Sequence, residues 1–129
     1  MTETTVLILA AFVHVLHIGL AGRYVNRTPE GRAWNASPRD TPREPGLMEG
    51  RARRAEANHL TALLLFTVAV VAVALRDEGS WVTATCAWLF LLARLLYIPA
   101  YLGAWVPWRS VIWLVGFAAT GIMLLAALF

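Results

Sequence analysis

Four polar residues at the start of one apolar segment are spaced so that they could bind an anion together. They lie three or four positions apart and therefore share one face of a helix: Arg51, Arg54, Asn58 and Thr61. The leucines and the phenylalanine of the same segment, RARRAEANHLTALLLF, spread over the rest of the helix surface. We expect the polar stripe to face protein or water, where guanidinium and amide groups donate hydrogen bonds to a negatively charged ligand.

A second apolar segment repeats this arrangement with Arg94, Tyr97 and Tyr101, which are again three and four positions apart. In a segment that crosses a membrane, an arginine costs about 2.5–3.5 kcal/mol on insertion scales, so it usually faces a partner or an aqueous cavity. Arg109 adds another cation at the start of the next apolar segment. The apolar stretches at about 5–21, 58–75, 81–102 and 110–129 contain no Asp or Glu, and Glu56 is expected to point away from the polar stripe. We therefore predict that the missing negative charge arrives with a ligand that carries carboxylates, a thiolate or a phosphate.

A purely structural interpretation of the same residues stays open. Arg51 and Arg53, near a helix end, can extend to lipid headgroups. Tyr97 and Tyr101 can belong to the aromatic belt of a membrane interface. Arg94 fits this interpretation less well, because it lies about two helical turns inside the end of its segment.

The elements that must position these residues are membrane-spanning helices. The chain is 59% hydrophobic and 15% charged, which is too apolar for a soluble domain of this size. A hydrocarbon core about 30 Å thick takes roughly 20 apolar residues to cross. The sequence therefore predicts an all-α integral membrane four-helix bundle, a single domain over residues 1–129, with helices at about 5–21, 51–75, 81–102 and 109–129.

The segment between the first two helices, about 22–50, is predicted to be a cytoplasmic loop with irregular backbone. It holds four of the six prolines. All eleven basic residues are arginines, and eight of them lie between or at the start of these helices: Arg23, Arg27, Arg32, Arg39, Arg43, Arg51, Arg53 and Arg54. The positive-inside rule then places both termini on the non-cytoplasmic side. Membrane lipids with anionic headgroups are the expected contact of this loop, and the net charge of +3 requires no nucleic acid.

His14 and His17 are three positions apart on the first helix and could form a pair of metal or haem ligands. The sequence offers no second ligand pair, and His59 lies off the polar stripe. We therefore predict no metal site and assign the histidines to hydrogen bonding or helix contact within the membrane. Cys86 is expected to be a packing residue.

A small multidrug transporter is the competing class of four-helix membrane protein. Such a carrier couples proton exchange to transport of a cationic drug and needs a carboxylate within the membrane. The apolar stretches at about 5–21, 58–75, 81–102 and 110–129 contain the cation Arg94 and no Asp or Glu. The sign of the internal charge therefore argues against a transporter.

Two segments, RARRAEANHLTALLLF and ARLLYIPAYLGAWVPWRSVIW, resemble the MAPEG family, the membrane-associated proteins in eicosanoid and glutathione metabolism. The loop segment SPRDTPREPG is similar to the bacterial branch of that family. The likeness covers essentially the whole chain. It implies a four-helix bundle of the bacterial inner membrane that assembles as a homotrimer, with glutathione bound between neighbouring subunits on the cytoplasmic side.

The resemblance also implies a role for each matching residue. Arg109 would be catalytic, because a cation beside the sulfur of glutathione lowers the pKa of its thiol. The implied activity is that of a glutathione-dependent transferase or peroxidase, with a small lipophilic electrophile or hydroperoxide in an apolar groove between subunits. The implied glutathione-binding residues are Arg51, Arg54, Asn58, Arg94, Tyr97, Tyr101 and Ser110.

The chain departs from the pattern of the family at three positions. Thr61 stands where the family commonly has a glutamate that binds arginines and the ammonium group of glutathione. Trp113 and Val106 stand where some eicosanoid enzymes have a tyrosine and a further arginine. Some members of the family bind lipid without catalysis, so a non-enzymatic membrane protein that binds a ligand or acts as a scaffold is the alternative function.

Overall fold

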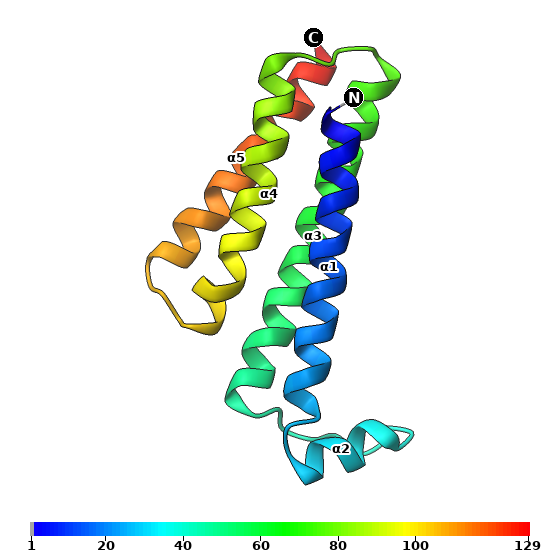
Figure 1. The fold of residues 1–129 in the computed structure, drawn as a ribbon, viewed down its shortest axis with the longest axis vertical. Helices are drawn as coiled ribbons and strands as arrows, with labels where there is room; N and C mark the ends of the chain where they lie inside the picture. The colour runs from blue at the N-terminus through cyan, green and yellow to red at the C-terminus, as the bar shows by residue number, and fades with distance from the viewer. Residues whose placement is uncertain (1) are drawn as a thin grey trace.

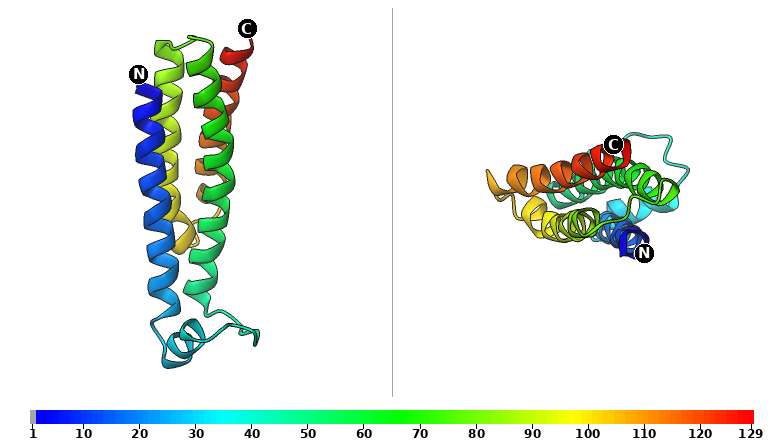
Figure 2. Two further views of the ribbon diagram at one scale, coloured as in Figure 1. Left: turned by 90° about the vertical axis from the view of Figure 1, so that its right-hand side faces the viewer. Right: turned by 90° about the horizontal axis from the view of Figure 1, so that it is seen from above.

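The computed structural model describes residues 2–129, which form four long helices, one short helix and no strand. The long helices run side by side as a bundle, and both chain ends lie at the end of the bundle opposite α2 (Figure 1). A view along the bundle shows the four long helices clustered together (Figure 2). The prediction of an all-α four-helix bundle is confirmed. The helices are α1 (Thr2–Val25), α2 (Pro29–Ala36), α3 (Leu47–Leu75), α4 (Trp81–Leu102) and α5 (Trp108–Leu128).

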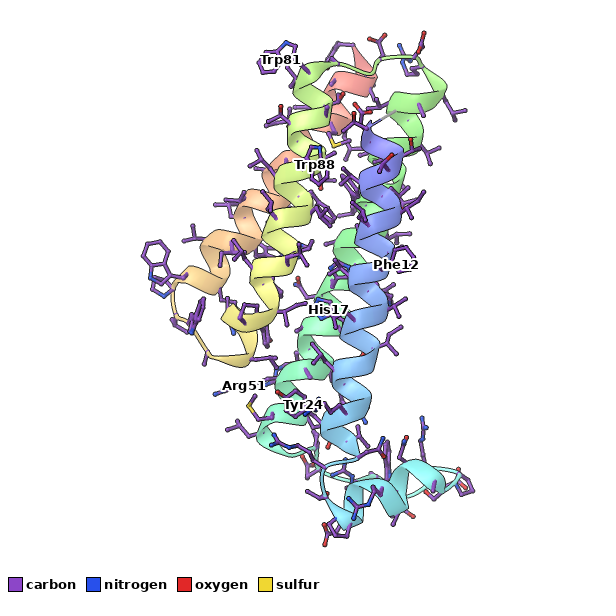
Figure 3. All side chains as sticks on the ribbon, in the orientation of Figure 1. Phe12, His17, Tyr24, Arg51, Trp81 and Trp88 are labelled. Atoms are coloured by element: carbon purple, nitrogen blue, oxygen red, sulfur yellow. The ribbon has the colours of Figure 1, made fainter. Side chains whose placement is uncertain are left out.

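All four long helices are long and apolar enough to cross a membrane. Large apolar side chains point outward, as Phe12 and Trp81 do in Figure 3, with exposed fractions of 66% and 80%. At 1.5 Å per residue, α4 is about 33 Å long, close to the thickness of a hydrocarbon core, whereas α3 is about 44 Å long and matches a bilayer with its headgroups. The first turns of α3 project past the loop between α4 and α5 toward α2 (Figure 1).

The segment 22–50 differs from the prediction of irregular backbone, because α1 continues to Val25, α2 occupies Pro29–Ala36 and α3 begins at Leu47. The side chain of Thr28 caps α2 by accepting a hydrogen bond from Gly31 N at 3.0 Å. Pro29 follows this cap, and its fixed φ suits the first turn of a helix. Proline therefore begins a helix here, and within the segment only residues 26–28 and 37–46 lie outside helices.

The apolar core lies in the half of the bundle nearest the chain ends. Its centre is the pair Phe66 and Phe90, whose rings stack with centroids 4.0 Å apart. Small residues such as Ala10, Ala69 and Ala87 are buried around them and allow the helices to approach closely. Cys86 is buried in the same cluster, which agrees with its predicted packing role. Arg94, His17 and His59 are buried in the other half of the bundle.

One carboxylate is buried at the chain-end side of the bundle. Glu3 is 3% exposed, and the hydroxyl of Thr83 donates a hydrogen bond of 2.6 Å to Glu3 Oε1. Thr83 also forms a capping box with Ser80 at the start of α4. The predicted first helix began at residue 5, whereas the helix begins at Thr2 and brings this carboxylate into the bundle.

Candidate functional site

Arg94 lies wholly buried on α4, at the point where α3, α4 and α5 meet. Its guanidinium donates hydrogen bonds to Asn58 Oδ1 at 3.2 Å and to the carbonyl oxygen of Trp113 at 3.3 Å. It also lies over the rings of Tyr97 and Phe90, at 5.0 and 5.6 Å from their centroids. The Nε atom of Arg94 is buried without a hydrogen-bond partner among the described residues. The predicted inward position of Arg94 thus agrees with the structure.

Two cavities adjoin each other between α3 and the α4–α5 pair, and both are lined by Asn58 and Trp113. The first, here called the polar cavity, has a volume of about 220 Å³ and is lined by Asn58, Tyr97, Tyr101, Arg109, Ser110 and Trp113. The second, the apolar cavity, has a volume of about 190 Å³ and is lined by Asn58, Thr61, Ala62, Leu65, Phe90, Arg94, Trp113, Gly116, Phe117 and Thr120.

The polar cavity is rich in hydrogen-bond donors. The guanidinium of Arg109 lies 4.9 Å from the centroid of the Tyr101 ring, and the rings of Tyr97 and Tyr101 contact each other with centroids 5.3 Å apart. Of the residues that line the two cavities in the described part of the chain, none is Asp or Glu. The arrangement therefore suits an anionic group next to an apolar one.

The loop between α4 and α5 brings Arg109 back over α4. Trp105 N donates to Ala100 O at 2.9 Å, and Ala104 has a positive φ of 54°, so the chain turns sharply at the end of α4. Arg109 N then donates to Trp105 O at 2.8 Å within the first turn of α5. This tight connection places Arg109 beside Tyr101 although the two lie on different helices.

The predicted stripe on α3 is divided by the structure. Asn58 lines both cavities, and Thr61 lines the apolar cavity while its hydroxyl donates to Ala57 O at 3.2 Å.

Arg51 instead donates from Nη1 to the carbonyl oxygen of Leu102 at 2.8 Å and so caps the end of α4 (Figure 3). Arg54 is exposed and lines neither cavity.

The predicted site residues therefore fall into two groups. Arg51 and Arg54 lie outside the two cavities within one subunit. The remaining predicted residues lie together at the cavities: Asn58, Arg94, Tyr97, Tyr101, Arg109 and Ser110.

Two residues of α5 belong to the site although no polar pattern indicated them. Trp113 contributes its backbone carbonyl to Arg94. Gly116 is required by close approach, since a Cβ atom there would lie 2.8 Å from Arg94 Nη2. Neither signal can be read from the side-chain types, because one is a backbone atom and the other is the lack of a side chain.

The three histidines form a stack between α1 and α3, in which His17 and His59 are buried and His14 is half-buried. The ring of His59 stacks on His17 with centroids 4.7 Å apart and on His14 at 5.5 Å. His59 Nε2 lies 3.2 Å from the carbonyl oxygen of Ala10. Within residues 2–129, no group of three metal-ligating side chains is arranged to hold a metal ion. The stack thus provides helix contact, the role predicted for His14 and His17, and His59 joins it.

A comparison with known protein families matches the chain to the MAPEG family over residues 3–129. Searches of curated proteins and of solved structures find no match to it. The matched range includes α1 from its second residue onward, the other three long helices, and every residue that lines the two cavities. The protein, with its four helices long and apolar enough to cross a membrane and its buried Arg94, therefore belongs to the MAPEG family of integral membrane proteins.

Proposed function

We propose that the polar cavity binds glutathione and that the protein is a glutathione-dependent transferase or peroxidase acting on lipophilic electrophiles. The observation that carries this proposal is the position of Arg109, whose guanidinium lies over Tyr101 in a cavity lined by hydrogen-bond donors and by no carboxylate among the described residues. Family membership supports the same conclusion.

The residues of the cavities fit most of the groups of glutathione. Its two carboxylates match the guanidinium of Arg109 and the hydroxyl groups of Tyr97, Tyr101 and Ser110. Arg94, whose Nε lacks a partner, offers a further donor at the boundary with the apolar cavity. The ammonium group of glutathione is matched less well. It needs an acceptor, and no carboxylate lines either cavity in the described part of the chain.

Glutathione would supply a thiol that attacks an electrophile or reduces a hydroperoxide. Arg109 would hold a positive charge beside that sulfur and so favour its deprotonated form at neutral pH. Tyr97 and Tyr101 would orient the ligand through their hydroxyl groups. Leu65, Phe90 and the other apolar residues of the adjoining cavity would hold the lipophilic partner and exclude water.

The assembly and orientation follow from the same proposal. We infer a homotrimer in a bacterial inner membrane, in which a neighbouring subunit covers the open side of the cavities. The positive-inside rule puts the α2 end in the cytoplasm and both termini on the opposite side. Cross-linking of the protein in native membranes should yield a three-subunit product, and cysteine labelling at residue 39 should occur only from the cytoplasmic side.

Thr61 favours the second candidate function, a non-enzymatic membrane protein that binds a ligand or acts as a scaffold. Its hydroxyl donates to Ala57 O, and it places no negative charge beside Arg94. Such a protein would keep the cationic interior and take up an anionic ligand other than glutathione.

Calorimetric titration of the purified protein with glutathione decides between these candidates, with the ultraviolet absorbance of the thiolate recorded in parallel. We expect binding with a thiolate signal that Arg109→Ala abolishes and Arg109→Lys partly restores. Arg76→Ala is the control, because Arg76 is exposed at the other end of the bundle. Absence of heat at about 1 mM glutathione, which corresponds to binding weaker than about −4 kcal/mol, would reject the enzyme and leave the non-enzymatic candidate.

A further inference from the structure

We propose that a cavity beside the N-terminus of α2, here called the headgroup cavity, binds the phosphate group of an anionic phospholipid. This cavity has a volume of about 260 Å³ and is separate from the polar and apolar cavities. Its walls come from the end of α1, the start of α2, the following loop and the start of α3, and include Tyr24, Arg27, Thr28, Arg43, Leu47 and Glu49.

The position of the headgroup cavity along the bundle matches the headgroup layer of a membrane. It lies at the end of α3 that projects past the loop between α4 and α5 (Figure 1). Because α4 alone already spans a hydrocarbon core, the first turns of α3 must lie in the interfacial layer. Leu47, which lines the cavity, is 69% exposed and is placed to contact the upper part of an acyl chain.

The charge of the headgroup cavity favours a phosphate. Arg27 and Arg43 line it, and Glu49 is the one carboxylate among its lining residues in the described chain. Glu49 is 5% exposed and already forms ion pairs with Arg43 and Arg53. Arg27 forms no ion pair within residues 2–129. The cationic groups therefore exceed the single carboxylate, and an anion from the membrane would restore the balance.

Arg43 is held in place before any ligand binds. Its guanidinium lies 5.3 Å from the Trp34 ring centroid, and that of Arg53 lies 5.5 Å from the same centroid. Trp34 Nε1 donates to Thr41 O at 2.9 Å, which ties α2 to the loop that carries Arg43. The Nε atom of Arg43 is buried and without a partner among the described residues. A guanidinium that is already held in place by its neighbours lowers the entropy cost of binding a phosphate.

The N-terminus of α2 adds to the positive potential of the headgroup cavity. Thr28 lines the cavity and is the N-cap of α2. The positive end of the helix dipole therefore lies at the cavity and favours a negatively charged group there.

The test is a titration of the full-length protein in detergent with phosphatidylglycerol, with lipid-bound and lipid-free protein counted by native mass spectrometry. We expect one saturable site, with affinity about fivefold lower in Arg27→Gln and in Arg43→Gln and partly restored in Arg27→Lys. Arg23→Gln is the matched control, since Arg23 is exposed at the same end of α1 and does not line the cavity. Its affinity should equal that of the parent.

Four outcomes would overturn the proposal. Equal weakening by Arg23→Gln and Arg27→Gln would show diffuse attraction by the basic surface. Equal binding of phosphatidylcholine would show that the negative charge is not recognised. Displacement of the lipid by inorganic phosphate alone would identify a site for the free ion. Arg27→Gln keeps both ion pairs of Glu49, so unchanged binding in this variant, with helicity retained, would also reject the site.

Discussion

Arg94 Nη1 lies 3.2 Å from Asn58 Oδ1, and this hydrogen bond joins α4 to α3 where the polar cavity meets the apolar cavity. Asn58 thus supplies the side-chain acceptor for a cation that is wholly buried. The other acceptor, the carbonyl oxygen of Trp113, belongs to α5. The guanidinium of Arg94 therefore connects α3, α4 and α5. Its two acceptors, on α3 and α5, hold it at the boundary between the two cavities.

Replacement of Asn58 by Ala should remove this support and leave Arg94 short of a partner. A hydrogen bond to a charged group contributes about 1.5–3 kcal/mol, so we expect a loss of that size in the free energy of unfolding, measured by titration with sodium dodecyl sulfate. Thr61→Ala is the control, because its hydroxyl bonds only to its own helix. Equal stability of the two variants would show that the bond between Asn58 and Arg94 is not stabilising.

A glutamate at position 61 should raise the affinity for glutathione. The carboxylate of Thr61→Glu would lie in the apolar cavity with Arg94 and provide the acceptor that the ammonium group needs. A charge-assisted hydrogen bond of about 1.5–3 kcal/mol corresponds to an affinity at least tenfold higher by calorimetry. The control is Thr61→Gln, whose side chain is as long as that of glutamate but carries no charge, and it should leave the affinity for glutathione nearly unchanged. A lower affinity in Thr61→Glu would mean that Arg94 itself binds an anionic group of the ligand.

Replacement of Gly116 by Ala should displace Arg94. The new Cβ would lie 2.8 Å from Nη2 and 3.2 Å from Nε, and the buried guanidinium could move only by losing a hydrogen bond. Gly121→Ala is a matched control on the same helix, with nothing within 4 Å of its Cβ, and should stabilise the bundle by about 0.5–1 kcal/mol. We expect Gly116→Ala to be less stable than this control and to bind glutathione more weakly. Equal stability and binding would show that Arg94 tolerates the methyl group.

Replacement of Thr83 by Ala should destabilise the end of the bundle where the chain termini lie. It removes the donor to Glu3 and half of the capping box at Ser80. A buried polar group that loses its hydrogen-bond partner lowers the free energy of unfolding by about 1–3 kcal/mol. Thr85→Ala is the control, because the hydroxyl of Thr85 bonds only to Trp81 O. This control should change the free energy of unfolding by less than about 0.5 kcal/mol. The measurement is unfolding in sodium dodecyl sulfate, and ligand binding at the distant cavities should stay the same in both variants.

The four long helices could be predicted from the sequence because membrane thickness fixes their length and the apolar segments are nearly continuous. The inward position of Arg94 could be predicted for the same reason, since a cation facing hydrocarbon is costly. The prediction of irregular backbone at α2 is wrong because it depends on the number of prolines and not on their positions. The pair Thr28 and Pro29 is in fact a helix start.

The rest of the site depends on how the helices pack. Spacing on α3 predicts Arg51, Arg54 and Asn58 on one face, yet Arg54 is exposed whereas Arg51 and Asn58 contact α4. The contact of His59 with His14 and His17 depends on the relative position of two helices along their axes. A single sequence contains no direct information on that position, and the same is true of the Trp113 carbonyl beside Arg94.

The histidine stack fixes the register of α1 on α3. A slide of α1 by one helical turn, about 5.4 Å, would separate His59 from His14 or His17 and would move an imidazole against apolar neighbours. These two helices therefore act as one rigid pair. The polar and apolar cavities are lined by residues of α3, α4 and α5 and by none of α1, so a tilt of the α4–α5 hairpin against that pair would change their volume. We therefore expect changes in the volume of the site to occur at the interface between α3 and the α4–α5 hairpin.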